Sequence, residues 1–362
     1  MITKFFGLIM TFACIPIARL SGDESLVLLA GGDDETVGVA AKEAKLFEPF
    51  AAEYDDNGEL WIIEMAQGNR LLRVNRQGKL EHVAGAMGGR DEKKGETFQD
   101  GAALDALFHG PHNLAIREAG EVWISDTWNG KIRVWKGITG EVRSLEHYGT
   151  DKGLARAQGP CCITFSPDKR TLHIANLRQV LAYDLQKGSV SVVAGNGEKG
   201  IPADGTRAVD APLVDPRAAA ADQEGNIYIL ERNGNALRVV RPSGRIETLV
   251  NRSGKAGDGL KEGAALDVQL NGPKHLCIDI DGGVIIADAE NHVIRKYNPK
   301  TRTIQCLVGN GKKGRGELGT PPRSFMLARP HGVSVDRATG HLVITDSYNN
   351  RVLMLKRGVP SR

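Results

Sequence analysis

Short apolar runs alternate along the chain with polar turns that are rich in glycine, asparagine and aspartate. Runs such as Leu60–Ile63, Val122–Ile124 and Leu342–Ile344 consist of β-branched, aromatic and leucine side chains. They are too short for helices, and no helical period links neighbouring runs. Many short strands at regular spacing, with turn residues between them, predict an all-β fold.

Three motifs recur in the same order and divide the chain into repeats. The first motif is a glycine loop behind an apolar run, with copies at Gly31, Gly85, Gly195 and Gly309 and degraded copies at Gly149 and Asn251. The second motif is a proline followed by an apolar run, as in "LFHGPHNLAI", and the third is strand, polar turn, strand, as in "EVWISDTWNGKIRVW". Each unit of roughly 55 residues therefore holds four short strands, which is typical of a β-propeller blade.

The order of the strands predicts how the ring closes. The chain begins with the fourth strand of a unit, Leu26–Ala30, and ends with a third strand, Arg351–Lys356. Pairing these two completes a sixth blade and removes two exposed sheet edges. We therefore predict a six-bladed β-propeller of four-stranded blades over residues 23–358, closed by its own N-terminal strand.

The first residues have the layout of a secretory signal peptide. Lys4 precedes an apolar stretch over residues 5–18, and polar residues follow. We expect residues 1–22 to be removed, residues 359–362 to form a short tail, and the protein to be periplasmic or secreted. The adjacent Cys161 and Cys162 leave open a vicinal disulfide, which forms only with strain.

Composition limits the classes of molecule that this protein is expected to bind. The formal net charge of the 362 residues is only +3, and basic and acidic residues are interspersed, which argues against nucleic acid. No later apolar run reaches the length of a membrane span. The G-x-G-x-x-G stretch at Gly195–Gly200 precedes a proline-rich segment without a helical period, which argues against a phosphate loop. We expect a monomer that binds a protein, a peptide or an anionic small ligand.

An acidic residue recurs at the turn between the second and third strands of the units. A catalytic group is needed once, whereas a turn is needed in every blade, so we interpret these acids as caps of local backbone N–H groups. Asn176 replaces the acid in the third unit. The acids are Glu64, Asp126, Glu231, Asp288 and Asp346.

The residue after each strand-opening proline varies from unit to unit. Because the first strand of a propeller blade is innermost, these residues should surround the mouth of the central channel. Variation within a rigid repeat marks positions where function can differ. In blade order the residues are Phe50, His112, Cys161, Arg217, Lys274 and His331.

The repeats resemble the NHL repeat. The best copy is "RPHGVSVDRATGHLVITDSYNNRVLML", and "GPHNLAI…VWISDTWNGKIRV" and "GPKHLCI…VIIADAENHVIRKY" are close to it. The resemblance covers nearly the whole chain after residue 22. It implies a propeller fold.

Within this fold, the chain is distantly similar to the propeller of the peptidyl-hydroxyglycine amidating lyases. That family holds zinc with three histidines in Pro-His steps on alternate blades. His112 and His331 match two of these steps, but Arg217 stands at the third, and His275 is offset by one residue. Tyr348 resembles the catalytic tyrosine that this family carries in a turn.

Two hypotheses for function follow. The first is an extracytoplasmic binding module that uses its channel-mouth face and no cofactor. The second is a lyase or hydrolase in which His112 and His331 hold a divalent metal, zinc or calcium, and Tyr348 is the catalytic candidate. The break at Arg217 favours the binding module. Its pocket should contain His112, Arg217, Lys274 and His331, with Trp128 and Tyr348 on the turns above them.

Overall fold

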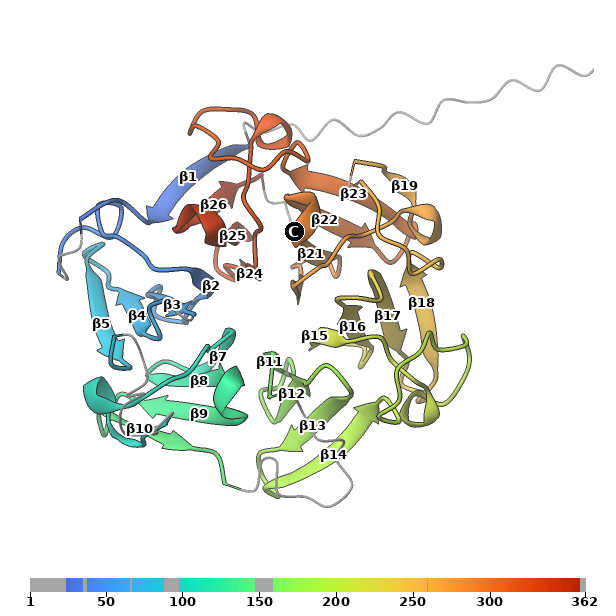
Figure 1. The fold of residues 1–362 in the computed structure, drawn as a ribbon, viewed down its shortest axis with the longest axis horizontal. Coiled ribbons are helices and arrows are strands. Elements are labelled where there is room, and N and C mark those ends of the chain that lie inside the picture. The colour runs from blue at the N-terminus through green and yellow to red at the C-terminus, as the bar shows by residue number, and fades with distance from the viewer. Residues whose placement is uncertain are drawn as a thin grey trace, which may run out of the picture.

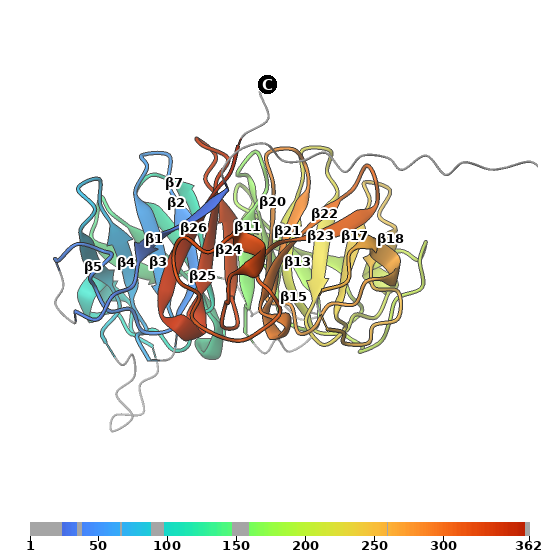
Figure 2. The ribbon, with the colours of Figure 1, turned by 90° about the horizontal axis from the view of Figure 1, so that it is seen from above.

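The computed structural model describes residues 24–34, 38–65, 67–87, 98–146, 159–258 and 260–358. In this part of the chain, six antiparallel sheets form a ring around a central axis (Figure 1). Seen from the side, the ring is a disc (Figure 2). The predicted six-bladed β-propeller is confirmed. The predicted signal peptide (1–22) and tail (359–362) lie outside the described residues.

Each blade runs from an inner strand to an outer strand. Blades one to three contain β2 (Pro49–Tyr54), β3 (Leu60–Glu64), β4 (Leu71–Val74) and β5 (Leu80–Ala84); β7 (Asn113–Glu118), β8 (Glu121–Asp126), β9 (Lys131–Lys136) and β10 (Glu141–Ser144); and β11 (Cys162–Phe165), β12 (Thr171–Ala175), β13 (Val180–Asp184) and β14 (Ser189–Ala194). Blades four and five contain β15 (Pro216–Ala221), β16 (Ile227–Glu231), β17 (Ala236–Val240) and β18 (Ile246–Val250); and β20 (His275–Ile278), β21 (Val284–Asp288), β22 (Val293–Asn298) and β23 (Thr303–Val308).

Two further strands were not expected from the repeat. The two-residue strands β6 (Gly101–Ala102) and β19 (Gly263–Ala264) add a fifth, outermost strand to blades two and five. The remaining elements are three-residue 3-10 helices in the loops and turns: η1 (Ala103–Asp105), η2 (Thr127–Asn129), η3 (Ala208–Asp210), η4 (Ala265–Asp267), η5 (Ala289–Asn291), η6 (Pro322–Ser324) and η7 (Ser347–Asn349).

The N-terminal strand closes the ring. Blade six contains β24 (Gly332–Val335), β25 (Leu342–Asp346) and β26 (Arg351–Lys356), and its outer strand is β1 (Ser25–Ala30). β1 pairs antiparallel with β26, from Ser25 opposite Lys356 to Ala30 opposite Val352. This is the predicted closure, and it joins the two ends of the described chain in one sheet.

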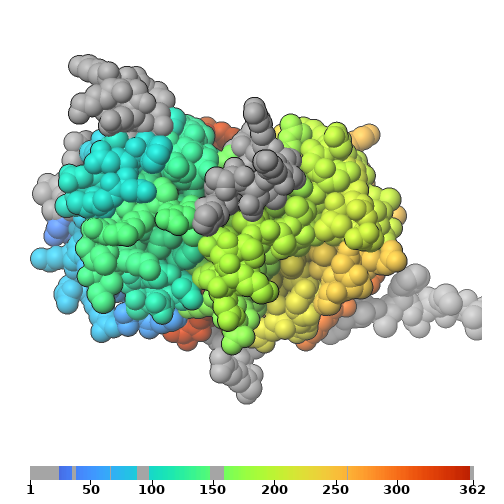
Figure 3. Space-filling model, turned by 90° about the horizontal axis from the view of Figure 1, so that it is seen from below, coloured from blue at the N-terminus to red at the C-terminus, as the bar shows by residue number. Residues whose placement is uncertain are grey.

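The hydrophobic core lies between neighbouring blades. Alternate side chains of a strand point to opposite faces of its sheet. In β3, Trp61 and Ile63 therefore pack toward blade two, while Leu60 and Ile62 pack toward blade six. Comparable clusters join the other neighbouring blades of the described chain. Figure 3 shows the side chains of blades two, three and four packed side by side along the outer edge of the disc.

The glycine loops link each outer strand to the next blade. Gly309 has a φ of 109°, and a Cβ there would lie 2.5 Å from the carbonyl oxygen of His292. Its N–H donates to the carbonyl of Pro322 over 2.9 Å. Gly195 has the same conformation, with a φ of 97°, and Asn251 replaces it with a φ of 57°. These loops are therefore connections that require left-handed backbone, which glycine and asparagine tolerate.

The acids at the ends of the second strands are structural, but their partners differ from the predicted ones. Asp126 accepts a hydrogen bond from the N–H of His109, 17 residues upstream, over 2.7 Å. It also pairs with the fully buried Arg133 over 2.9 Å. A buried carboxylate is costly unless it has a charged partner, which a local turn does not supply. The equivalent pairs are Glu64–Arg70, Glu231–Arg238, Asp288–Arg295 and Asp346–Arg351.

Blade three lacks this ion pair at the corresponding turn. The side-chain oxygen of Asn176 accepts hydrogen bonds from the N–H groups of Arg178 and Gln179 over 3.0 and 2.8 Å. Asn176 is therefore a local turn cap, as predicted for this whole set of positions. In the other blades the acid also accepts a hydrogen bond from the loop that precedes the inner strand, and it thereby connects that loop to the turn.

Candidate functional site

The residues that follow the strand-opening prolines occupy equivalent positions at one end of the inner strands. Four of them donate a backbone hydrogen bond to the second strand of their blade: His112, Cys161, Lys274 and His331. Phe50 and Arg217 lie at β-bulges, where the pairing with the second strand skips one residue. Because the inner strands surround the axis (Figure 1), these residues line one mouth of the central channel.

The turns between second and third strands lie on the same face. The N–H of Trp128 donates to the carbonyl of His109 over 3.1 Å, and the N–H of Tyr348 donates to that of Ala328 over 3.1 Å. Both acceptors precede an inner strand by a few residues. The side chains of Trp128 and Tyr348 are 52% and 43% exposed. They therefore stand at the rim of the mouth.

Aromatic rings follow one another around half of the mouth. Trp128 contacts His112, with 6.1 Å between ring centroids, and His112 meets Phe50 edge-on at 5.2 Å. Phe50 stacks on His331 at 4.1 Å, and His331 stacks on Tyr348 at 5.8 Å. We call these five residues, on blades two, one and six, the aromatic arc.

The two histidines of the aromatic arc are held as neutral rings. Nδ1 of His112 lies 2.6 Å from the carbonyl oxygen of Gly110, and Nδ1 of His331 lies 2.8 Å from that of Arg329. A carbonyl only accepts, so Nδ1 carries the proton and Nε2 keeps its lone pair. Burial lowers the pKa of both rings well below the usual range, and nearby cations lower it further.

The opposite half of the mouth is cationic. Arg217 is 6% exposed, and no carboxylate among the described residues pairs with it. Nζ of Lys274 lies 3.4 Å from Glu290, and burial together with Arg217 lowers the pKa of Lys274 to about 8. Arg232 lies 3.7 Å from Asp215. We call Arg217, Arg232 and Lys274, on blades four and five, the cationic half.

The geometry does not favour a metal between the two histidines. The ring of Phe50 contacts both imidazoles and lies between blades two and six. Catalytic zinc sites use three protein ligands. The described ranges bring no three His, Cys, Asp or Glu side chains together in a ligating group.

Tyr348 is held by Arg329. Nη1 of Arg329 donates to the Tyr348 hydroxyl over 2.5 Å, and its guanidinium lies 4.7 Å from the ring centroid. The same guanidinium pairs with Glu290, which also contacts Lys274. Tyr348 thus ends a chain of polar contacts that runs from the aromatic arc to the cationic half.

A hydrogen bond across the ring was not predicted. Nδ2 of Asn113 in blade two lies 3.0 Å from Nε2 of His275 in blade five, on the opposite side of the axis. Nδ1 of His275 lies 3.0 Å from the carbonyl oxygen of Val333, and Asn113 accepts a hydrogen bond from the N–H of Ile163. Asn113 and His275 follow the mouth residues His112 and Lys274 in sequence. They therefore bridge the channel next to the mouth.

Cys161 and Cys162 are free, buried thiols. Cys162 packs in the hydrophobic cluster of blades four and five, and burial raises its pKa to about 12. A thiol with such a pKa is not nucleophilic at neutral pH. The pair forms no disulfide in this structure.

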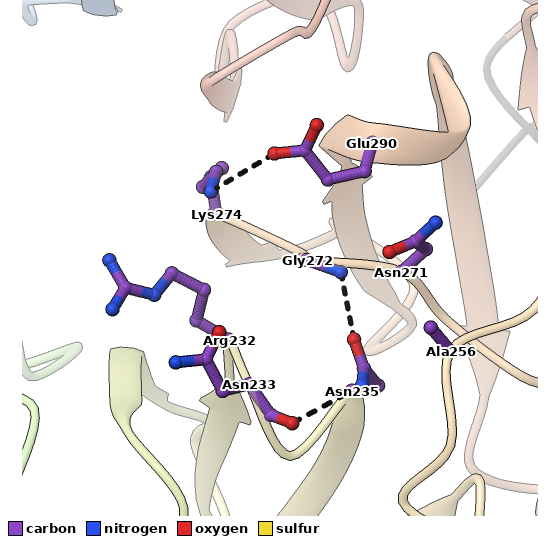
Figure 4. A pocket seen from close by; sticks show the side chains of 8 residues that line it. All are labelled: Arg232, Asn233, Asn235, Ala256, Asn271, Gly272, Lys274 and Glu290. Carbon is purple, nitrogen blue, oxygen red and sulfur yellow. Dashed lines mark hydrogen bonds and ion pairs between the residues drawn. The ribbon is translucent and has the colours of Figure 1, made fainter.

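A polar pocket of about 340 Å³ adjoins the cationic half. It lies between the turns of blades four and five, and its lining includes Arg232, Lys274 and Glu290 together with three asparagines. Figure 4 shows Arg232 and Lys274 on one side of this pocket and Asn271 and Ala256 on the other. Repeat patterns in the sequence do not indicate such a pocket, because its residues come from turns of two blades.

The comparisons with known proteins agree with the fold. The model of the NHL repeat matches residues 327–353, and that of the teneurin NHL domain matches residues 162–261. No helix of the described residues is long and apolar enough to cross a membrane.

Curated relatives are similar over most of the chain. SUPPRESSOR OF QUENCHING 1 from Arabidopsis thaliana is 25% identical over 292 residues, which are 74% of this chain and 27% of that protein. NHL repeat-containing protein 2 from Gallus gallus is 22% identical over 354 residues, 86% of this chain and 46% of that protein. The chain thus spans less than half the length of these relatives.

Solved structures share the fold at low identity. An auxiliary nutrient binding protein from Bacteroides thetaiotaomicron superposes with a TM-score of 0.67 at 13% identity, over 92% of this chain and 76% of that one. Likeness at this identity concerns the fold.

Proposed function

This chain is an NHL-repeat six-bladed β-propeller, and we propose that it is a binding module that takes an anionic group at the channel mouth. Propellers of similar architecture serve many functions, so a function is assigned from the residues of the site and not from the fold. The groups that we assign to the anion are Arg217 and Lys274. His112, His331, Trp128 and Tyr348 would surround the rest of the ligand.

Arg217 is the observation that carries this proposal. A buried charge is costly unless a group of opposite charge compensates it. The whole Arg217 residue is 6% exposed, and its guanidinium has no carboxylate partner among the described residues. Its neighbours Lys274, His112 and His331 are cationic or neutral. An anionic ligand would supply the missing charge.

The balance of charge favours a carboxylate over a dianion. Lys274 contacts Glu290 and Arg232 contacts Asp215, so these two cations are partly compensated within the protein. One uncompensated guanidinium matches one negative charge. Arginine also binds carboxylates through two parallel hydrogen bonds, which gives direction to the contact.

The location of the protein, its type of ligand and its oligomeric state are also part of the proposal. The N-terminal sequence favours an extracytoplasmic location after cleavage, and the ligand could be a protein, a peptide or a small molecule that presents a carboxylate. We expect a monomer without nucleic acid as a partner. One nutrient-binding protein shares the fold, which is consistent with a binding module.

Thermal unfolding with added anions tests the proposal. Acetate, glycolate, malate and inorganic phosphate are compared at equal ionic strength on the wild type and on Arg217→Gln. We expect at least one carboxylate to raise the wild-type Tm and to leave that of Arg217→Gln unchanged. Arg323→Gln, at an exposed arginine outside the mouth, should respond like the wild type. Equal responses of wild type and Arg217→Gln would refute the proposal.

A metal-dependent lyase or hydrolase is the second candidate. The observation in its favour is that the Nδ1 contacts of His112 and His331 leave both Nε2 atoms available, as in many metal ligands. The position of Phe50 stands against it. Stoichiometric zinc or calcium in the purified protein, lost on His112→Ala, would support this candidate over the binding module.

A further inference from the structure

The two sides of the mouth offer opposite hydrogen-bonding groups. Arg217 and Lys274 are donors without acceptors. The neutral rings of His112 and His331 present Nε2 lone pairs, which accept, and neither atom has a partner among the described residues. A carboxylate satisfies only the donors. A hydroxyl group donates and accepts, so a ligand that carries both groups satisfies both sides.

The rim supplies exposed aromatic faces. Trp128 is held in place rather than free to rotate, because its ring lies against Gly110, where a Cβ would stand 2.3 Å from Cδ2 of the indole. Gly110 has a φ of 56°, and His109 packs edge-on against the indole at 5.0 Å. Fixed, half-exposed Trp and Tyr rings bind the apolar faces of ligands that also have polar edges.

The polar pocket continues the mouth between blades four and five. Lys274 lies at the mouth and also lines the pocket. Asn233 and Asn235 are engaged through their Nδ2 atoms, whereas the Asn271 amide has no hydrogen-bond partner among the described residues. An amide that is available on both its oxygen and its nitrogen suits hydroxyl groups. Arg232 and Glu290, which also line the pocket, add a donor and an acceptor.

These three features together define a ligand class. We infer that the ligand is an acidic sugar, a hexuronate whose carboxylate meets Arg217 and whose hydroxyls meet the histidines, with a second, neutral sugar unit in the pocket beside Lys274. This inference rests on the proposed function, because it uses the same Arg217 contact. A simple carboxylate would leave the imidazole acceptors and the Asn271 amide unused.

Titration calorimetry on the full chain with defined probes tests the class of ligand. The probes are galacturonate, galactose, acetate and the disaccharide galacturonosyl-rhamnose. We expect galacturonate to bind at least ten times more tightly than either galactose or acetate. If acetate binds as tightly as galacturonate, the sugar inference is overturned and the binding-module proposal survives. If no anion binds, both are overturned.

Two variants test how the sugar is held. Trp128→Ala should weaken galacturonate binding at least fivefold. Ile138→Ala should not change it, because this 96% exposed side chain follows β9, at the opposite end of that strand from Trp128. Galacturonosyl-rhamnose, which carries one carboxylate, should bind more tightly than galacturonate, and Asn271→Ala should remove that gain without weakening galacturonate. Full retention of both affinities in Trp128→Ala and Asn271→Ala would contradict the assignment.

Discussion

Arg217 lies at a β-bulge at the channel mouth. The pairing of β15 with β16 passes from Pro216 to Ala218, so Arg217 stands outside the regular ladder. Bulges redirect a side chain without disturbing the rest of a sheet. Phe50 lies at the same bulge in β2. The repeat thus provides one position per blade where the residue type can change while the fold stays the same.

Lys274 makes anion binding dependent on pH. Burial and Arg217 lower its pKa to about 8, so it is protonated at pH 7 and loses its charge as the pH rises through 8. We expect the affinity for a bound carboxylate to fall between pH 7 and 9.5, by severalfold. Titrations across this range on wild type and Lys274→Gln check this. The variant should bind more weakly at pH 7 and show a flatter profile.

The same pH profile in both proteins would contradict this role of Lys274. The histidines do not produce a similar change in this range. Their pKa values are lowered below the usual range, so both rings stay neutral from pH 7 upward.

At the scale of elements, buried ion pairs hold the loops of the mouth face in place. Asp288 at the end of β21 binds the backbone N–H of Asn271 over 2.8 Å and pairs with Arg295 of β22 over 2.9 Å. Both charged side chains are fully buried. The pair therefore fixes the segment that precedes Lys274 and lines the polar pocket.

Asp288→Asn removes a buried carboxylate while Arg295 keeps its charge. Breaking a buried ion pair on one side costs about 3–5 kcal/mol, so the free energy of unfolding should fall by that amount. Urea unfolding measures it. Glu141→Gln is the matched control, because Glu141 pairs with Arg143 at the surface, where such pairs are worth at most about 1 kcal/mol. Equal decreases in the free energy of unfolding of the two variants would show that the buried ion pair does not stabilise the fold more than a surface pair does.

The repeats could be predicted because their evidence is local. Strand length, the post-proline step and the glycine loops are short patterns, and each recurs. The sequence also contains a pattern for the ion pairs, since an arginine follows the acid seven residues later in Asp126–Arg133 and Asp288–Arg295. A turn cap needs only the acid, so the role predicted for the acids included no arginine.

Contacts between blades could not be predicted in the same way. The bridge from Asn113 to His275 joins residues 162 positions apart on opposite blades. The insertion of Phe50 between two histidines depends on three blades at once. Spacing along the chain identified the positions at the mouth, but their division into an aromatic arc and a cationic half follows from the closed ring.

For the whole molecule, ring closure is what brings the site together. The aromatic arc draws on blades two, one and six, and blades one and six meet because β1 and β2 come from the start of the chain while β24 to β26 come from its end. His331 consequently stacks on Phe50, 281 residues earlier in the sequence. The mouth therefore exists only in the closed propeller.

A crystal structure of the protein soaked with a carboxylate that stabilises it, or with galacturonate, tests the central claim most directly. We predict density for a carboxylate at the channel mouth, with both oxygens within about 3 Å of the Arg217 guanidinium. A mouth that contains only solvent, with Arg217 paired to a carboxylate of the protein itself, would contradict it.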